Sequence, residues 1–339
     1  MPSSLLPVRG SDERNPRSWQ QAAFWLGMTW LADRTNDEWV RATIFDLGNR
    51  NEWQPGKRTY MADDYSVGMT YLWAAQHGAG EMAIRPLRAS FDKVLASPSR
   101  VHFAMYKDKA TGEWPCVNRW CWADSIFMGP SVWIELSRQT KDPRYRDFAI
   151  SEFKATKAFL FDPEENLFYR DNRFFGRPED GGPKIFWARG NGWVIAGLAR
   201  MLNSLPQDDP DRADIESLFR AMATRLAGLQ HPDGFWSPSL LGPAGSPETS
   251  GTGLITFALA YGIGHGLLDR VTFEPVVRKG WSALASAVNA DGRLGWVQQP
   301  AEKPGEVTAA STTPYGAGAF LLAASAIADL NLDAGAPRR

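Results

Sequence analysis

The carboxylic acid of Asp124 lies in the stretch WCWADSIFMGP, which runs from residue 120 to residue 130. Two tryptophans precede this acid and apolar residues follow it, so an ionised carboxylate would be poorly solvated there. Burial among apolar groups raises the pKa of an acid, whereas a position at a helix N-terminus lowers it. Asp124 is therefore either a helix cap or an acid tuned to donate a proton, and we favour the catalytic interpretation.

A second carboxylate could come from the stretch MADDYSVG, which holds Asp63 and Asp64. If one of them faces Asp124, repulsion between like charges keeps one acid of the pair protonated near neutral pH. Two acids with separated pKa values divide the roles in sugar hydrolysis. We predict Asp64 as the second catalytic residue, because it lies four residues before Gly68, a small residue that would open space beside it. Asp63 is then predicted to bind substrate.

The stretch FWARGNGW is a second dense cluster of chemical groups. An arginine beside aromatic rings can bind a substrate carboxylate through two hydrogen bonds while a tryptophan stacks on the sugar ring. The alternative is that this arginine bridges loop carbonyls and has a structural role. From this cluster we predict four substrate-binding residues, Trp187, Arg189, Asn191 and Trp193.

Residues near the starts of other apolar helices, and in loops, complete the predicted binding site. They are Trp122, Arg170, Trp236, Glu248 and Thr249. Structural alternatives stay open for three of them. Glu248 and Thr249 can be helix caps, and Arg170 can pair with its neighbour Asp171.

The composition favours a neutral or small partner such as an oligosaccharide. Lys and Arg (37) nearly balance Asp and Glu (38), and no basic run is present. These features argue against nucleic acid and against an anionic membrane as partners. The 15 tryptophans suit sugar stacking, because a pyranose presents apolar C–H faces to an aromatic ring.

The sequence predicts neither a metal site nor a cofactor. The four histidines are scattered and share no motif. Cys116 and Cys121 lack nearby histidine ligands, and we expect both to be free thiols. No apolar run is long enough for a transmembrane helix, and the N-terminus has no secretory signal, so we expect a cytoplasmic or periplasmic protein. The oligomeric state cannot be predicted.

Helical periodicity dominates the chain, and we expect no strand longer than a few residues. The pattern predicts eleven helices, at residues 16–34, 36–50, 63–77, 81–96, 123–139, 142–159, 190–204, 211–230, 249–265, 273–289 and 312–329. They alternate between two kinds. One kind is charged along one face, and the other is apolar nearly all round and must be buried on every side.

The spacing of the apolar helices predicts the architecture. They recur about every 60 residues, which is typical of an array of helical hairpins. With the helix near residue 16 there are six inner helices, so we predict an all-α fold, an (α/α)6 barrel with an inner and an outer ring. Only five outer helices can be assigned. The N-termini of the inner helices would meet at one mouth, within a single catalytic domain of residues 1–339 whose ends, 1–14 and 331–339, are irregular.

Several motifs resemble glycoside hydrolase family 105, the unsaturated rhamnogalacturonyl hydrolases. They are WADSIFMGPSVWIELSRQTKDPRY, FWARGNGWVIAGLARML, DGFWSPSLL, PETSGTGLITFALAYGI and STTPYGAGAFLLAASAI, within residues 19–330. The resemblance implies the (α/α)6 barrel and removal of a 4,5-unsaturated uronic acid from lyase products. It further implies that an acid matching Asp124 protonates C4 of the vinyl ether while water adds at C5. The acid matching Asp64 would stabilise the developing cation or orient water, and Trp187 and Arg189 would bind substrate.

One departure from the family concerns the stretch FYRDN, where some members have a histidine. Arg170 or Asp171 can substitute there, so the identity and linkage of the leaving sugar stay open. Two other functions also stay open. One is a different enzyme on the same barrel, such as an inverting glycosidase or a polysaccharide lyase, and the other is an inactive carbohydrate-binding protein.

Overall fold

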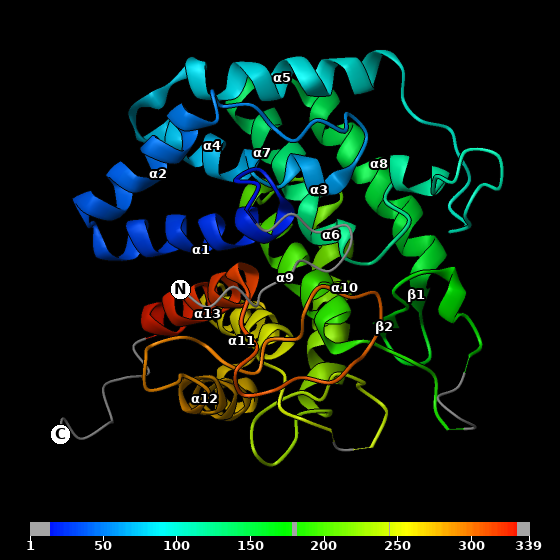
Figure 1. Ribbon diagram of the computed structural model, residues 1–339, viewed down its shortest axis with the longest axis vertical. Helices are drawn as coiled ribbons and strands as arrows, with labels where there is room; N and C mark the ends of the chain where they lie inside the picture. Colours follow the sequence, from blue (N-terminus) through cyan, green and yellow to red (C-terminus); the bar gives the residue numbers. More distant parts are fainter. Residues whose placement is uncertain (1–13, 178–181, 244, 331–339) are drawn as a thin grey trace.

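Six helices form a closed inner ring in the computed structural model, which describes residues 14–177, 182–243 and 245–330. Each inner helix packs against the next, and the last returns to the first, so that α1 and α13 lie side by side (Figure 1). The inner helices are α1 (Trp19–Thr35), α4 (Gly68–Ala74), α7 (Pro130–Thr140), α9 (Ala188–Ser204), α11 (Thr249–Gly264) and α13 (Pro314–Asp329). The predicted (α/α)6 barrel is therefore confirmed.

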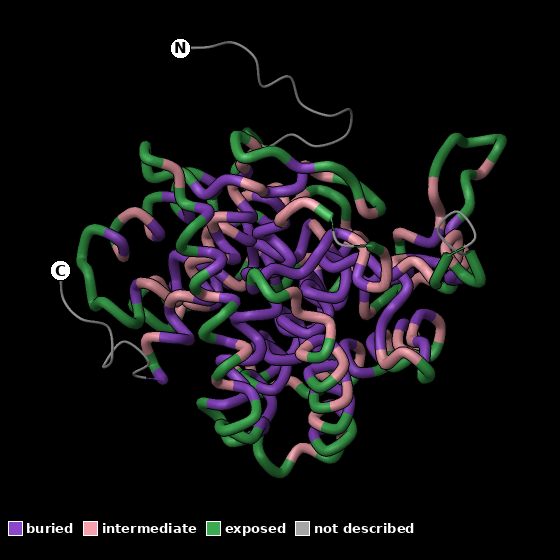
Figure 2. The backbone as a smooth tube through the Cα atoms, turned by 90° about the horizontal axis from the view of Figure 1, so that it is seen from below, coloured by how far each residue is buried: buried purple, intermediate pink, exposed green. Residues whose placement is uncertain are grey.

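Five helices form the outer layer, each following an inner helix and packing on it. They are α2 (Glu38–Arg50), α5 (Glu81–Ala96), α8 (Pro143–Leu160), α10 (Arg212–Ala227) and α12 (Arg270–Ser286). The described ranges contain no sixth outer helix. Figure 2 shows the resulting burial, with buried chain in the centre of the molecule and exposed chain around it. Nearly every residue of α9 and α11 is buried, as their all-apolar character requires.

Two predicted inner helices are broken near their N-termini. The first consists of α3 (Ala62–Tyr65) and α4, followed by a wide turn at Ala75–Ala79. The second consists of α6 (Ser125–Met128) and α7, and the break falls at Gly129, directly before Pro130. Proline cannot donate a backbone hydrogen bond and clashes with the preceding turn, which favours the start of a new helix at Pro130. The short leading helices α3 and α6, which contact each other, place the acidic residues at the mouth of the ring.

The connection between α8 and α9 contains a small hairpin that later supports the site. It consists of β1 (Phe161–Asp162) and β2 (Leu167–Phe168), which pair antiparallel. Two-residue strands agree with the expectation that no strand exceeds a few residues. Within the described residues no helix combines the length and apolar character needed to cross a lipid bilayer. The predicted irregular ends lie outside these residues, except for residue 14.

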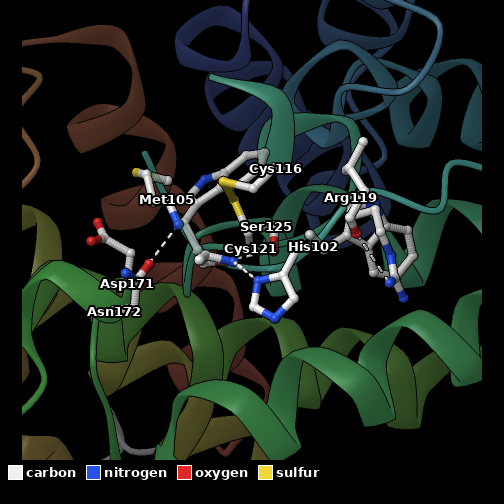
Figure 3. Close-up of a disulfide and its surroundings, with 12 residues drawn as sticks. His102, Met105, Cys116, Arg119, Cys121, Ser125, Asp171 and Asn172 are labelled. Carbon is white, nitrogen blue, oxygen red and sulfur yellow. Dashed lines mark hydrogen bonds between the residues drawn. A yellow bond between two sulfur atoms is a disulfide. The ribbon is translucent and has the colours of Figure 1, made fainter. Parts of the chain in front are cut away.

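The prediction that both cysteines are free thiols is wrong. Cys116 and Cys121 form a disulfide, and both residues are fully buried (Figure 3). A 3-10 turn at Pro115–Asn118 reverses the chain and brings the two Cα atoms to 5.7 Å, within the range of disulfide geometry. The spacing of two cysteines does not reveal such a turn. The disulfide closes the loop that leads directly into Trp122 and Asp124.

Candidate active site

Asp124 lies at the mouth of the ring, at the N-cap position of α6. Its side chain nevertheless caps nothing, because no backbone N–H of the helix donates to it. The chain ahead of α6 is held by another contact, from the backbone N–H of Ala123 to the carbonyl oxygen of Arg170, 2.9 Å. The simple capping interpretation therefore has no support, and the carboxyl group of Asp124 is free for chemistry.

The surroundings of Asp124 favour its protonated form. Its side chain is 15% exposed, and its Oδ2 atom is buried without a hydrogen-bond partner among the described residues. Burial raises the pKa of Asp124, and the positive charges of Arg170 and Arg189 only partly offset this rise. The nearest cationic atom is Nε of Arg170, 3.8 Å from Oδ2, which is too long for a hydrogen bond. A raised pKa, in a carboxyl group that no cation holds by a hydrogen bond, suits an acid that has to donate a proton.

Asp63 and Asp64 have different partners, although they are neighbours. Asp64 accepts hydrogen bonds from Arg58, from its backbone nitrogen at 2.7 Å, from Nε at 3.0 Å and from Nη2 at 2.5 Å. No described residue donates to the carboxylate of Asp63. Burial raises the pKa of Asp63 from 3.8 to about 7; Arg58 opposes this rise, while the negative charges of Asp64 and Asp124 add to it. Asp63 is thus the acid that is coupled to Asp124 and free to react.

Gly68 does not open the space beside Asp64 that its small size suggested. A Cβ atom at Gly68 would lie 2.9 Å from Leu87 and Val132, so this glycine allows close packing and opens no space beside Asp64. The room for Asp64 comes from Gly56, where a Cβ atom would lie 2.3 Å from Cγ of Asp64. The contacts therefore favour Asp63 over Asp64 as the second reactive carboxylate.

Asp63→Asn is expected to stabilise the fold at neutral and alkaline pH. Because the pKa of Asp63 is higher in the folded than in the unfolded chain, the wild type loses stability as the pH rises from about 4 to about 7. Asparagine cannot ionise and avoids this loss, on the order of 3 kcal/mol above pH 7. Urea unfolding at pH 4 and pH 8 measures the difference, which should vanish at pH 4. The matched control, Asp64→Asn, should destabilise the protein instead, because it breaks the pairing with Arg58.

Arg189 holds the loop that follows α12. Its Nη1 atom donates to the carbonyl oxygen of Gln298 at 2.5 Å and to the hydroxyl of Tyr315 at 2.9 Å, and Nη2 donates to the carbonyl oxygen of Gln299 at 3.1 Å. The guanidinium group also stacks on the ring of Trp187, at 4.3 Å. Arg189 therefore bridges loop carbonyls, as in the structural alternative to substrate binding that the sequence left open. Arg189 still contributes positive charge near Asp124.

The other predicted residues of this cluster support the same frame. Nε1 of Trp187 donates to Oε1 of Gln298 at 2.8 Å. The side chain of Asn191 pairs with both backbone groups of Phe168, at 2.8 and 3.0 Å, and so joins α9 to β2. Trp193 is buried and packs against Phe127 and Tyr315. These side chains position the mouth, and their polar atoms are directed into the protein.

The contacts of three further predicted residues also have a structural role. These residues are Glu248, Thr249 and Trp236. Glu248 is fully buried and caps α11, accepting hydrogen bonds from the backbone nitrogens of Ser250 and Gly251 at 2.9 and 2.6 Å. The hydroxyl of Thr249 donates to the carbonyl oxygen of Gly295. Nε1 of Trp236 donates to the carbonyl oxygen of Leu226. The capping interpretation therefore describes the contacts of Glu248, while Trp122, 4% exposed, packs in the core beside Asp124.

Two charged residues of the site are missed by the sequence analysis. Arg58 precedes Asp64 by six residues, and only the fold of the intervening chain shows that it neutralises this acid. Arg173 pairs with Asp171 through two hydrogen bonds, from Nε and from Nη2 of its guanidinium group. The pattern RDNR at residues 170–173, with an acid between two arginines, is the signal that could have indicated this pairing.

One cavity in the described part of the chain lies at the opposite mouth. It measures about 450 Å³ and is lined by side chains near the C-terminal ends of the inner helices, including Trp73, Glu135 and Arg138. Its acid Glu135 is already paired, since it accepts hydrogen bonds from Gln76, Arg138 and Gln139. The unpartnered acid Asp124 makes the N-terminal mouth the better candidate site. In neither mouth do three described His, Cys, Asp or Glu side chains gather as a metal site requires.

Comparison with known proteins supports a carbohydrate-active enzyme. The family model of glycosyl hydrolase family 88 matches residues 8–330. An unsaturated 3S-rhamnoglycuronyl hydrolase from Alteromonas sp. (strain LOR) is 38% identical over 92% of this chain and 77% of its own length. A polysaccharide lyase of known structure is 30% identical, with a TM-score of 0.82 over 95% of this chain and 93% of that one. A possible family 105 member from Salmonella enterica shares the fold at 18% identity and a TM-score of 0.75, over 91% of this chain and 82% of that one.

Proposed function

Because the chain belongs to glycosyl hydrolase family 88, we propose that it removes a terminal 4,5-unsaturated uronic acid from oligosaccharides that polysaccharide lyases leave behind. The protein is a glycoside hydrolase, and the Alteromonas relative is named for an unsaturated rhamnoglycuronyl substrate. We therefore propose rhamnose as the leaving sugar. The single observation that supports this chemistry is Asp124, a buried acid at the mouth with a raised pKa and no hydrogen bond to Oδ2.

The proposed reaction hydrates the vinyl ether of the unsaturated sugar. Asp124 donates its proton to C4, and positive charge develops at C5 and the ring oxygen. Water adds at C5 and gives its proton to a carboxylate, so that a hemiketal forms. The hemiketal opens and releases the neighbouring sugar, with one water consumed in total. No covalent bond to the enzyme is needed, so the rule that carboxyl separation predicts retention or inversion does not apply.

Asp63 and Arg170 fit the two remaining roles. Asp63 lies within electrostatic reach of Asp124, and with a pKa of about 7 it can accept a proton from the attacking water near neutral pH. The guanidinium group of Arg170 has a buried Nε without a partner among the described residues, directed toward Asp124. The carboxylate of the sugar is bonded to C5, next to the carbon that Asp124 protonates. We assign its binding to Arg170, because its unpartnered Nε lies 3.8 Å from Oδ2 of Asp124, whereas Arg189 is fixed by its bonds to Gln298, Gln299 and Tyr315.

The test is the ultraviolet absorption of the conjugated C=C–COO⁻ group during incubation with unsaturated disaccharides. A hydrolase of this kind removes the band, because hydration destroys the conjugation. The polysaccharide lyase among the similar structures supports a second candidate, and a lyase would create the band from a saturated polymer. The direction of the absorbance change therefore separates the two enzymes. No change with either substrate, together with retained sugar binding, would identify a binding protein instead.

Of the two expected compartments, cytoplasm and periplasm, we propose the periplasm. The buried disulfide between Cys116 and Cys121 supports it, because disulfides persist in oxidising compartments and are rare in the cytoplasm.

A further inference from the structure

Asp171 is a carboxylate that the proposed reaction does not use. It follows β2, its side chain has no exposed surface, and it lies between two arginines. Oδ1 accepts from Nε and the backbone nitrogen of Arg173 at 2.8 and 2.9 Å, and Oδ2 accepts from Nη2 of Arg173 at 2.9 Å and from Nη1 of Arg170 at 2.7 Å. A fully buried ion is retained only when such partners satisfy it.

The outer arginine anchors Asp171. Arg173 grips the carboxylate with two parallel hydrogen bonds, an arrangement that is strong and restrictive in geometry. Arg173 is itself held by an ion pair with Glu302 at 2.7 Å and by its position over the ring of Trp114 at 5.2 Å. Asp171 therefore cannot follow Arg170 if that side chain moves. Figure 3 shows Asp171 beside Met105, close to the disulfide that precedes Asp124.

Arg170 lies between two carboxylates, and only one of them holds it. Its Nη1 atom donates to Asp171 and lies 3.3 Å from the sulfur of Met105. Its Nε atom lies 3.8 Å from Oδ2 of Asp124, and both of these atoms are buried without a hydrogen-bond partner in the described chain. A displacement of about 1 Å would bring them to hydrogen-bonding distance. The two acids thus compete for one guanidinium group, and in this structure Asp171 holds it.

We propose that Asp171 is a positioning residue that holds Arg170 back from Asp124, so that Asp124 stays without a hydrogen-bonded cation and Arg170 keeps a free donor for substrate. Without Asp171, the buried guanidinium of Arg170 would lose its hydrogen-bonded carboxylate partner. The nearest remaining carboxylate is that of Asp124, and pairing with it would ionise the catalytic acid. The expected effect on turnover rests on the proposed function. The competition of Asp171 and Asp124 for Arg170 does not.

The other charged groups around Asp124 do not provide the same control. Arg189, on α9, lowers the pKa of Asp124 but is fixed by its bonds to Gln298, Gln299 and Tyr315. Asp63, on α3, lies within electrostatic reach of both Arg170 and Asp124, but among the described residues it forms no ion pair with Arg170. Arg170 is therefore the cation whose position can change, and Asp171 is the side chain that determines this position.

The kinetic test compares four proteins, the wild type, Asp171→Asn, Arg170→Ala and the double variant. In Asp171→Asn, kcat at pH 7 is expected to fall about 100-fold, and the alkaline limb of the pH profile should move about one unit toward acid. In the double variant, kcat should be about tenfold higher than in Asp171→Asn, because the arginine that neutralises Asp124 is gone. Its KM should stay above that of the wild type, because Arg170 no longer binds the substrate carboxylate. A double variant no faster than Asp171→Asn, or an Asp171→Asn profile equal to that of the wild type, would overturn the proposal.

Asp162→Asn is the matched control for simple structural damage. Asp162 is also a buried carboxylate of the same hairpin, and it pairs with Lys184 and Tyr169 instead of Arg170. Its replacement should cost stability without moving the pH profile. If Asp171→Asn unfolds, Asp171→Glu provides the second variant, since a longer acid would push Arg170 toward Asp124 and should shift the profile in the same direction.

A measurement without substrate separates this proposal from the proposed function. The carboxyl carbon of Asp124 can be titrated by nuclear magnetic resonance in all four proteins. Loss of Asp171 should lower the pKa of Asp124 more when Arg170 is present than when it is absent, because only Arg170 can move to pair with it. Equal shifts in the two backgrounds would contradict the positioning role even if the enzyme is active. An inactive wild type with unequal shifts would contradict only the proposed function.

Discussion

Asp124→Asn is expected to lower kcat about 1000-fold and leave KM nearly unchanged. Asparagine has the same shape as the protonated acid but cannot donate a proton to C4. The ultraviolet assay with an unsaturated disaccharide measures the loss. Folding should not suffer, because the side chain of Asp124 caps no helix and Oδ2 makes no hydrogen bond.

The stability of this variant provides an internal control. Burial raises the pKa of Asp124 in the folded protein, so the wild type loses stability as the pH rises above the ordinary pKa of an aspartic acid. Asp124→Asn should therefore be at least as stable as the wild type at pH 8, with loss of activity and no loss of fold. Turnover near the wild-type rate would show that another group protonates the substrate.

Gly318→Ala is expected to destabilise the protein by about 3 kcal/mol or more, the largest stability effect predicted here. Gly318 lies where α13 closes the ring against α1. A Cβ atom there would lie 2.2 Å from the carbonyl oxygen of Ala23 and 2.6 Å from its carbonyl carbon. These are backbone atoms, which cannot rotate away as a side chain can. Accommodation of the methyl group therefore requires that the first and last inner helices separate, and urea unfolding measures the cost.

Gly264→Ala is the control for the intrinsic effect of replacing glycine in a helix. Gly264 ends α11, and the nearest atom to its added Cβ would be a side-chain carbon of Leu330 at 3.4 Å. Alanine should be neutral or slightly stabilising there, because it favours helix more than glycine does. Equal effects at the two positions would show that α1 and α13 do not pack as closely as the ring requires.

Most of the architecture could be predicted from the sequence, because the spacing of apolar residues differs between a helix buried on all sides and one buried on a single face. The helices α9 and α11 are apolar nearly all round, which predicted inner helices, and the charged faces of α8 and α10 predicted helices that face water. The breaks between Tyr65 and Gly68 and at Gly129 were harder to predict. They interrupt apolar periodicity without changing it, since α6 and α7 both bury apolar residues.

The candidate site could be predicted only in part. The apolar stretch around Asp124 indicated a buried acid, because residues adjacent in the chain supplied its surroundings. The predictions for Arg189, Asn191 and Trp187 identified the region, but these side chains bond to Gln298, Gln299 and Phe168, which are distant in sequence. Residue type indicates which bonds a side chain can make, and not which partner it meets.

The sequence by itself determined the helical barrel and the apolar surroundings of Asp124 at its mouth, because periodicity and local polarity act over a few residues. Only the tertiary structure decided which of Asp63 and Asp64 is neutralised, since Arg58 reaches one of them alone. It also decided that Cys116 meets Cys121, and that Arg170 donates a hydrogen bond to Asp171 and none to Asp124. Charge pairing and bond formation depend on distances of a few ångströms between side chains, and these distances exist only once the ring has closed.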